Sequence, residues 1–197
     1  MDNLLSIFLF AVVMTITPGP NNIMILASGL NFGIKRSIPH LFGIAIGFPM
    51  MLLAVGFGLD SIVVKFPLVH NMIKILGVGY LLYLAYKLFM TKKQQSINSQ
   101  IKPLSFIQAV LFQWVNPKAW VMIFSGIGAF TSSVNIQSTT WVLALSFMVA
   151  IFPCNGSWLF LGSQMKKLIK TDAHYQWFNR TMAILLVISV LPSAIVL

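Results

Sequence analysis

The chain has 197 residues, of which 58% are hydrophobic and 8% are charged, and its formal net charge is +10. This composition excludes an ordinary soluble domain, in which about 25% of the residues are charged. We expect one integral membrane domain over residues 1–197, because the apolar stretches leave no length for a separate soluble domain.

Six apolar stretches follow one another along the chain, at roughly 4–30, 39–59, 69–90, 104–130, 139–163 and 180–197. Each approaches or exceeds the ~20 residues that a helix needs to cross a bilayer. The third is the weakest, and it spans if Lys74 and Lys87 extend their ammonium groups to the two interfaces. The sequence therefore predicts an all-α membrane protein with six transmembrane helices.

Proline and glycine interrupt the first and the fourth stretch, at T-P-G-P-N-N over residues 17–22 and at N-P-K-A over residues 116–119. Proline frees backbone N–H and C=O groups, which cost several kcal/mol each where lipid surrounds them. Such a break is tolerated where protein or a wet cavity covers it, and transporters use it to hold substrates at mid-membrane. We therefore predict that transmembrane helices 1 and 4 are broken and form a substrate site.

A polar linker over residues 91–103 divides the chain into repeat 1, about 1–90, and repeat 2, about 104–197. Each half holds three predicted spans, and an odd number of spans turns the second half upside down relative to the first. The breaks fall at corresponding places in the two halves, as do Phe48-Pro49 and Phe152-Pro153. Inverted repeats with broken helices are typical of secondary transporters, so we predict two inverted three-helix repeats.

The basic residues gather on one side of the predicted spans. Ten of the 13 follow the first, third or fifth stretch, whereas Lys65 and Lys74 lie on the other side and Lys118 lies inside the fourth stretch. The positive-inside rule then places loops 1, 3 and 5 in the cytoplasm and both termini outside. Contact with anionic lipid explains most of these charges, so the lipid bilayer, and no nucleic acid, is the predicted partner.

Lys118 gives the predicted site its charge. Asn116 is a favoured N-cap and Pro117 a favoured first helical residue, so a half-helix with a positive dipole end is expected to start there. No aspartate lies near Lys118 in the sequence and the chain has no glutamate, so a substrate carboxylate is the expected counter-ion. Two other interpretations stay open: a re-entrant segment with Lys118 near an interface, and a neutral lysine that only packs.

Residues around the breaks supply other polar groups. Asn21 and Asn22, together with backbone carbonyls freed by the prolines, can accept hydrogen bonds from a substrate ammonium. Asn155 and Trp158 follow Pro153 in F-P-C-N-G-S-W, which is interpreted as a third break. The candidate substrate-binding residues are Thr17, Pro18, Gly19, Pro20, Asn21, Asn22, Asn116, Pro117, Lys118, Asn155 and Trp158.

An enzyme is not predicted, because one cysteine, three scattered histidines and no mid-membrane carboxylate supply neither a nucleophile–base pair nor a metal site. We assign no catalytic residue, no metal ligand and no cofactor. A passive pore for small zwitterionic solutes and a non-transporting structural subunit stay open as alternatives, and so does a homo-oligomer. His40 and Asp60 are the titratable candidates for proton coupling.

Taken together, these motifs resemble the LysE/RhtB amino-acid exporters. The resemblance rests on T-P-G-P-N-N, on the G-x-x-x-G that follows with Lys35-Arg36, on N-P-K-A-W, and on N-x-x-W-x-x-x-G from Asn155. It covers essentially the whole chain and implies a small secondary transporter of the bacterial inner membrane, driven by proton-motive force. The double asparagine is similar to exporters of cysteine and O-acetylserine, whereas many relatives carry aspartate in place of Asn21.

The sequence narrows the substrate class. A cationic amino acid needs an interior carboxylate for its side chain, and none is visible in the predicted spans near the breaks. A neutral zwitterion needs only an anion site and carbonyl acceptors, which the breaks supply. We therefore predict export of small neutral amino acids or derivatives, of the cysteine, O-acetylserine and homoserine or threonine class.

Overall fold

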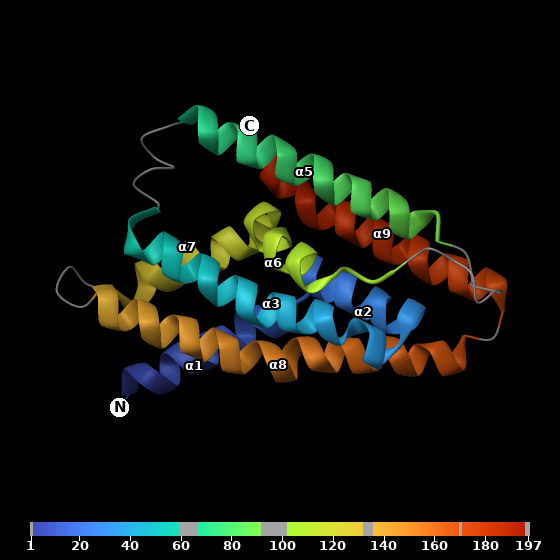
Figure 1. The fold of residues 1–197 in the computed structure, drawn as a ribbon, viewed down its shortest axis with the longest axis horizontal. Coiled ribbons are helices and arrows are strands. Elements are labelled where there is room, and N and C mark those ends of the chain that lie inside the picture. Colours follow the sequence, from blue (N-terminus) through green and yellow to red (C-terminus); the bar gives the residue numbers. More distant parts are fainter. Residues whose placement is uncertain (1, 60–66, 92–101, 132–135, 170, 196–197) are drawn as a thin grey trace.

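The computed structural model describes residues 2–59, 67–91, 102–131, 136–169 and 171–195 (Figure 1). All regular secondary structure in these ranges is helical. The elements are α1 (Asp2–Ile16), α2 (Pro20–Phe32), α3 (Ile34–Ala54), the π-helical turn η1 (Val55–Leu59), α5 (Pro67–Phe89), α6 (Phe106–Val115), α7 (Pro117–Phe130), α8 (Ile136–Leu168) and α9 (Asp172–Ile195).

Two continuous helices are long and apolar enough to cross a membrane, over Ile34–Gly58 and Ile136–Met165. The pair α1 and α2 satisfies the same requirement as one broken span with a bend of 57°. Helices also cover the other three predicted stretches, although their longest apolar helical parts, such as Val78–Phe89 and Phe106–Val115, are shorter. The predicted all-α membrane protein is confirmed at this level.

Both predicted interruptions are present. Between α1 and α2, Gly19 is extended and Pro20 takes the first helical position, where its missing N–H costs nothing. Between α6 and α7, the Asn116 side chain accepts a hydrogen bond from the Lys118 N–H at 3.1 Å, and Pro117 begins the helix. The predicted N-cap at Asn116 is therefore confirmed.

The predicted third break at Pro153 is wrong. α8 runs without interruption from Ile136 to Leu168 and carries Pro153 inside it. A single proline removes one backbone hydrogen bond, whereas T-P-G-P combines two prolines with a glycine. Contacts with α1, α2 and α3 hold α8 along its length, which is how membrane helices tolerate proline.

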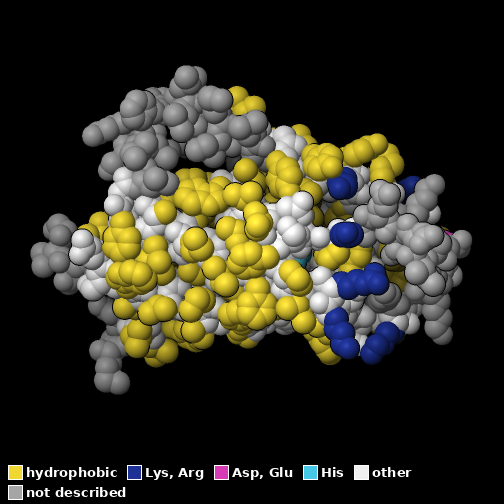
Figure 2. Space-filling view, viewed as in Figure 1, with side chains coloured by type: hydrophobic (Ala, Val, Ile, Leu, Met, Phe, Trp, Pro, Cys, Tyr) yellow, Lys and Arg dark blue, Asp and Glu magenta, His cyan; other side chains and the backbone are white. Residues whose placement is uncertain are grey.

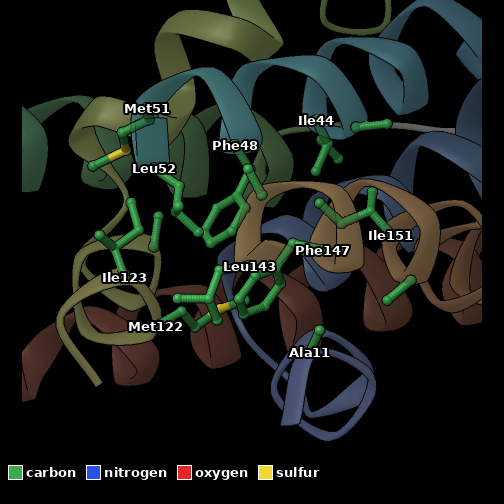
Figure 3. Packing of buried hydrophobic residues seen from close by; sticks show 14 of the residues in the cluster. Ala11, Ile44, Phe48, Met51, Leu52, Met122, Ile123, Leu143, Phe147 and Ile151 are labelled. Atoms are coloured by element: carbon green, nitrogen blue, oxygen red, sulfur yellow. The ribbon is translucent and has the colours of Figure 1, made fainter. Parts of the chain in front are cut away.

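Helix α8 forms the centre of the packing. It contacts α1, α2, α3 and α7, while α5 and α9 pair with each other along one side of the molecule (Figure 1). In the core, Phe48 of α3 and Phe147 of α8 point toward one another, with ring centroids 4.8 Å apart (Figure 3). Leu143 and Ile151 extend the same face of α8, and Ile123 of α7 closes it (Figure 3).

Glycines allow the backbones of α2 and α8 to approach closely. A Cβ atom on Gly162 of α8 would lie 2.0 Å from the carbonyl oxygen of Leu26, and one on Gly29 of α2 would lie 2.3 Å from that of Leu159. Gly33, with φ of 78°, ends α2 and lets the chain turn directly into α3. These contacts fix α2, and with it the first break, against α8.

Lysine and arginine side chains gather at the end of the molecule where α2 turns into α3 (Figure 2). The rest of the visible face is largely hydrophobic (Figure 2). Lys35, Arg36, Lys87 and Lys102 are exposed members of this group, which we call the basic end. Lys65 and the side chain of Lys74, which were predicted for the opposite end, lie outside the described residues.

Candidate functional site

The two breaks lie side by side, although they are about a hundred residues apart in the sequence. The Lys118 ammonium at the start of α7 donates to the hydroxyl of Thr17 at 2.8 Å, to the Thr17 carbonyl, and to the Pro18 carbonyl at 3.4 Å. Thr17 and Pro18 belong to the break between α1 and α2. The fold therefore brings together the first and the second break around one cationic side chain.

Side chains satisfy the carbonyl groups that α1 leaves open at its C-terminal end. The Asn22 amide donates to the carbonyls of Thr15 at 2.9 Å and Thr17 at 2.8 Å. The Trp158 indole donates to the Ile16 carbonyl at 3.1 Å. The last C=O groups of every α-helix lack a partner within the helix. Inside a membrane protein, other protein groups have to donate hydrogen bonds to them.

This arrangement places the Lys118 ammonium in a more favourable electrostatic environment than its position in the sequence suggests. Its sequence position places it beside the positive N-terminal end of α7, which is unfavourable. Its ammonium, however, reaches the negative C-terminal end of α1 at Thr17. The carbonyl dipoles offset part of the desolvation cost without any acidic side chain.

A second layer of amide contacts holds the asparagines of α2. The Asn155 side-chain amide of α8 donates to the side-chain oxygen Oδ1 of Asn22 at 2.9 Å. Asn21 and Gln113 form a reciprocal pair, with N–H to O distances of 2.8 Å and 3.2 Å. Gln113 and Asn155 are both almost fully buried, so these contacts fix the start of α2 against α6 and α8.

Gln113 and Thr15 are site residues that the sequence interpretation missed. Gln113 is a polar residue between the apolar pairs Leu111-Phe112 and Trp114-Val115, three positions before Asn116, and a polar residue there is a recognisable signal. Thr15 gives no such signal, yet it is buried and its hydroxyl has no hydrogen-bond partner in the described structure.

We expect Gln113→Leu to lower the free energy of unfolding by about 1–3 kcal/mol, because it leaves the half-buried Asn21 amide without its partner. The double variant Asn21→Leu/Gln113→Leu should recover part of this loss, since both polar groups are then gone. Thermal unfolding of the purified protein in detergent measures both. A double variant less stable than the sum of the two single changes would contradict the pairing.

A cavity of about 20 Å³ lies between the breaks. It has room for about one water molecule and none for an amino acid, so the structure holds the site closed. Among the described residues that line it, Lys118 is the only charged one. The lining residues are Met14, Thr15, Gly19, Asn21, Asn22, Ile44, Phe48, Asn116, Lys118, Met122, Ile151 and Asn155.

The start of α2 adds a partial positive charge to the same cavity. Gly19 is the N-cap, so no side chain caps the first amides of α2. Gly19 also lies against Lys118, since a Cβ atom there would be 2.5 Å from the lysine Cδ. Ammonium groups and uncapped helix N-termini are groups that bind carboxylates in proteins, and asparagine and backbone oxygens are acceptors for an ammonium.

Some of the other predicted residues lie at this site, whereas the two candidates for proton coupling do not lie among its described residues. Asn116 caps α7 and lines the cavity, Pro117 begins α7, and Pro20 begins α2 between Gly19 and Asn21, which both line the cavity. His40 is not part of this site, because it lines a different cavity near the basic end. Asp60 lies outside the described residues.

Comparison with known proteins supports a transporter family. Residues 12–194 match the family model described as LysE type translocator. The chain is 31% identical over 184 residues to the cysteine/O-acetylserine efflux protein of Salmonella choleraesuis (strain SC-B67), with 90% of each chain covered. It is likewise 31% identical over 183 residues to the cysteine/O-acetylserine efflux protein of Escherichia coli (strain K12), again with 90% of each covered.

No solved structure matches the chain. The family model nevertheless covers most of its length, and the similarity to the efflux proteins extends over nearly all of each relative. The chain therefore belongs to the family of LysE type translocators.

Proposed function

We propose that this translocator is a secondary transporter that exports small neutral amino acids or close derivatives across the bacterial inner membrane. The substrates would be of the cysteine, O-acetylserine and homoserine or threonine class. The observation that carries the proposal is the lining of the cavity between the breaks, where one ammonium group faces amide and backbone oxygens and no carboxylate lies among the described lining residues. Such a site complements a zwitterion, whereas a second, cationic side chain would find only neutral oxygens there.

The proposed binding mode uses an exchange of partners at Lys118. A substrate carboxylate attracts the Lys118 ammonium and the first amides of α2. The carbonyls of Thr17 and Pro18, which accept from Lys118 in the closed site, then become available to the substrate ammonium. Both charges of the zwitterion thus replace existing contacts, and no buried group is left unpaired.

The proposed architecture is six transmembrane helices in two inverted three-helix repeats, with the breaks in helices 1 and 4. It is supported by helices over each of the six apolar stretches and by the direct contact between the two breaks. The basic end would face the cytoplasm, following the positive-inside rule, and both termini would face outward. Rocking of one repeat against the other would expose the site to each side in turn.

Export against a gradient requires a source of energy, which we assign to the proton-motive force with His40 and Asp60 as the coupling groups. His40 is the better candidate for a first test, because its position near the basic end is known and Lys87 and Lys102 line the same cavity. Efflux by His40→Gln, measured at two imposed pH gradients, should respond less to the gradient than wild-type efflux. An unchanged response would remove His40 from the coupling.

The test of the proposed function is efflux from proteoliposomes loaded with cysteine, O-acetylserine, threonine, homoserine, lysine or arginine. We expect saturable efflux of one or more of the first four and none of the last two. Efflux of lysine or arginine alone would contradict the proposal. Flux that does not saturate would support a passive pore, and no flux of any solute would support a structural subunit.

A further inference from the structure

A second and larger cavity lies near the basic end, between α2, α3, α5 and the segment that leads into α6. Its volume is about 120 Å³, against about 20 Å³ for the cavity between the breaks. A cavity of about 150 Å³ accommodates benzene, so this space approaches the size of a small amino acid. We call it the basic-end cavity, and its lining includes Ser28, Asn31, His40, Leu84, Lys87 and Lys102.

His40 is the one side chain of this lining that is both buried and without a partner in the described structure. It is 1% exposed, and neither ring nitrogen makes a hydrogen bond. The other buried polar groups of the wall are satisfied. Asn31 donates to Asn179 at 3.0 Å, and the hydroxyls of Ser28 and Ser37 lie 2.7 Å apart.

An unpaired buried imidazole is costly, and such a group in a native protein requires an explanation, for example a catalytic role or a bound water or ion. The neutral ring carries one N–H donor and one acceptor nitrogen. Both nitrogens are themselves buried, so a substrate ammonium or hydroxyl would reach them only after a rotation of the ring or a movement of the cavity wall. Because the hydrogen bonds of Asn31 and Ser28 are used within the protein, His40 provides the free polar group at the buried side of the cavity.

The exposed side of the basic-end cavity is cationic. Lys87 and Lys102 are exposed and line it, and no acidic residue is among the lining residues. Lys87 also lies over the Tyr83 ring, 5.3 Å from its centroid, which limits the positions of its ammonium group. Two exposed lysines and a buried histidine in one cavity wall suit a molecule with a carboxylate at one end and a polar hydrogen-bonding group at the other.

We propose that the basic-end cavity is a second binding site for a small neutral amino acid. Its carboxylate would face Lys87 and Lys102, and its ammonium or side-chain hydroxyl would reach His40. Ser28 and Asn31 belong to α2, the helix whose other end carries Asn21 and Asn22, so one helix joins the two cavities. The use of this site to load substrate from the cytoplasm rests on the export proposed above, whereas binding itself does not.

The imidazole of His40 provides a direct readout of binding. In the variant His70→Gln/His174→Gln, His40 is the remaining histidine of the chain, so ¹⁵N-histidine labelling gives one set of imidazole signals. The protein is placed in nanodiscs of phosphatidylcholine, so that no anionic lipid headgroup competes for the lysines. L-serine and L-serinamide, which lacks the carboxylate, are then titrated separately.

We expect L-serine to shift the His40 signals with saturation and L-serinamide to need a concentration about tenfold higher or more. Adding Lys87→Gln/Lys102→Gln should raise the L-serine concentration at half-saturation about five- to tenfold, because two partly solvated charge contacts are lost. The charge-matched control Lys35→Gln/Lys167→Gln, at exposed residues outside the cavity, should leave it unchanged.

The shift of the His40 signals must also be independent of binding at the site between the breaks. Lys118→Gln should leave the His40 titration unchanged, even if that variant no longer transports. The inference is overturned if L-serine gives no saturable shift, if L-serinamide acts as strongly as L-serine, or if Lys118→Gln abolishes the response. Failure of the transport assay alone would count against the proposed function and not against this site.

Discussion

Lys118→Gln should reduce efflux about 10- to 100-fold while the protein still inserts and purifies normally. A hydrogen bond to a charged group contributes about 1.5–3 kcal/mol, and about 1.4 kcal/mol corresponds to tenfold. Glutamine can still donate to the Thr17 carbonyl and so retains part of the closure between the breaks. What it removes is the positive charge, which the proposed substrate carboxylate requires.

The matched control for this change is Lys167→Gln. Lys167 is exposed near the end of α8 and loses the same charge without touching either cavity. Its efflux should equal that of the wild type. If Lys118→Gln transported within twofold of the wild type, Lys118 would have a closing role between the helices and no role in substrate binding.

Gly162→Ala should be the most damaging of the small substitutions to the fold. The added Cβ atom would lie 2.0 Å from the Leu26 carbonyl oxygen and 2.9 Å from the Leu26 carbonyl carbon, both in the backbone of α2. A helix backbone cannot rotate away as a side chain can, so α2 and α8 must separate. Overpacking of this kind costs typically about 1–3 kcal/mol or more, and here it also moves Asn21 and Asn22.

Gly156→Ala is the control within the same helix. Apart from the neighbouring residues and backbone of its own helix, no described atom lies within 4 Å of the position that a Cβ on Gly156 would take. Alanine is favoured over glycine in a helix by about 1 kcal/mol, so this variant should be as stable as the wild type or more stable. Melting temperatures in detergent compare the two, and equal stability of Gly162→Ala and the wild type would contradict the close packing of α2 on α8.

The breaks at residues 17–19 and at Asn116 could be predicted from the sequence, because proline and glycine act through the local backbone. The cap at Asn116 followed from the same local rule and is confirmed. The helices also fall on the predicted apolar stretches, since length and hydrophobicity of a membrane helix are properties of the segment itself.

Contacts between distant segments were harder to foresee. The sequence places Lys118 at the positive end of α7, and only the fold places its ammonium on the carbonyls that end α1. At Pro153 the local rule predicts a break that is absent, because tertiary packing keeps α8 continuous there. The sequence likewise could not show that both ring nitrogens of His40 lack a hydrogen-bond partner, since this depends on which groups surround the ring.

The proposed transport requires contact between Lys118 and a substrate carboxylate where the two breaks meet. The most direct measurement compares an exported amino acid with its carboxamide as competitors of efflux, in the wild type and in Lys118→Gln. In the wild type, the acid should compete at a concentration at least about tenfold lower than the amide, and in Lys118→Gln this ratio should fall toward one. The same ratio in both proteins would contradict the account.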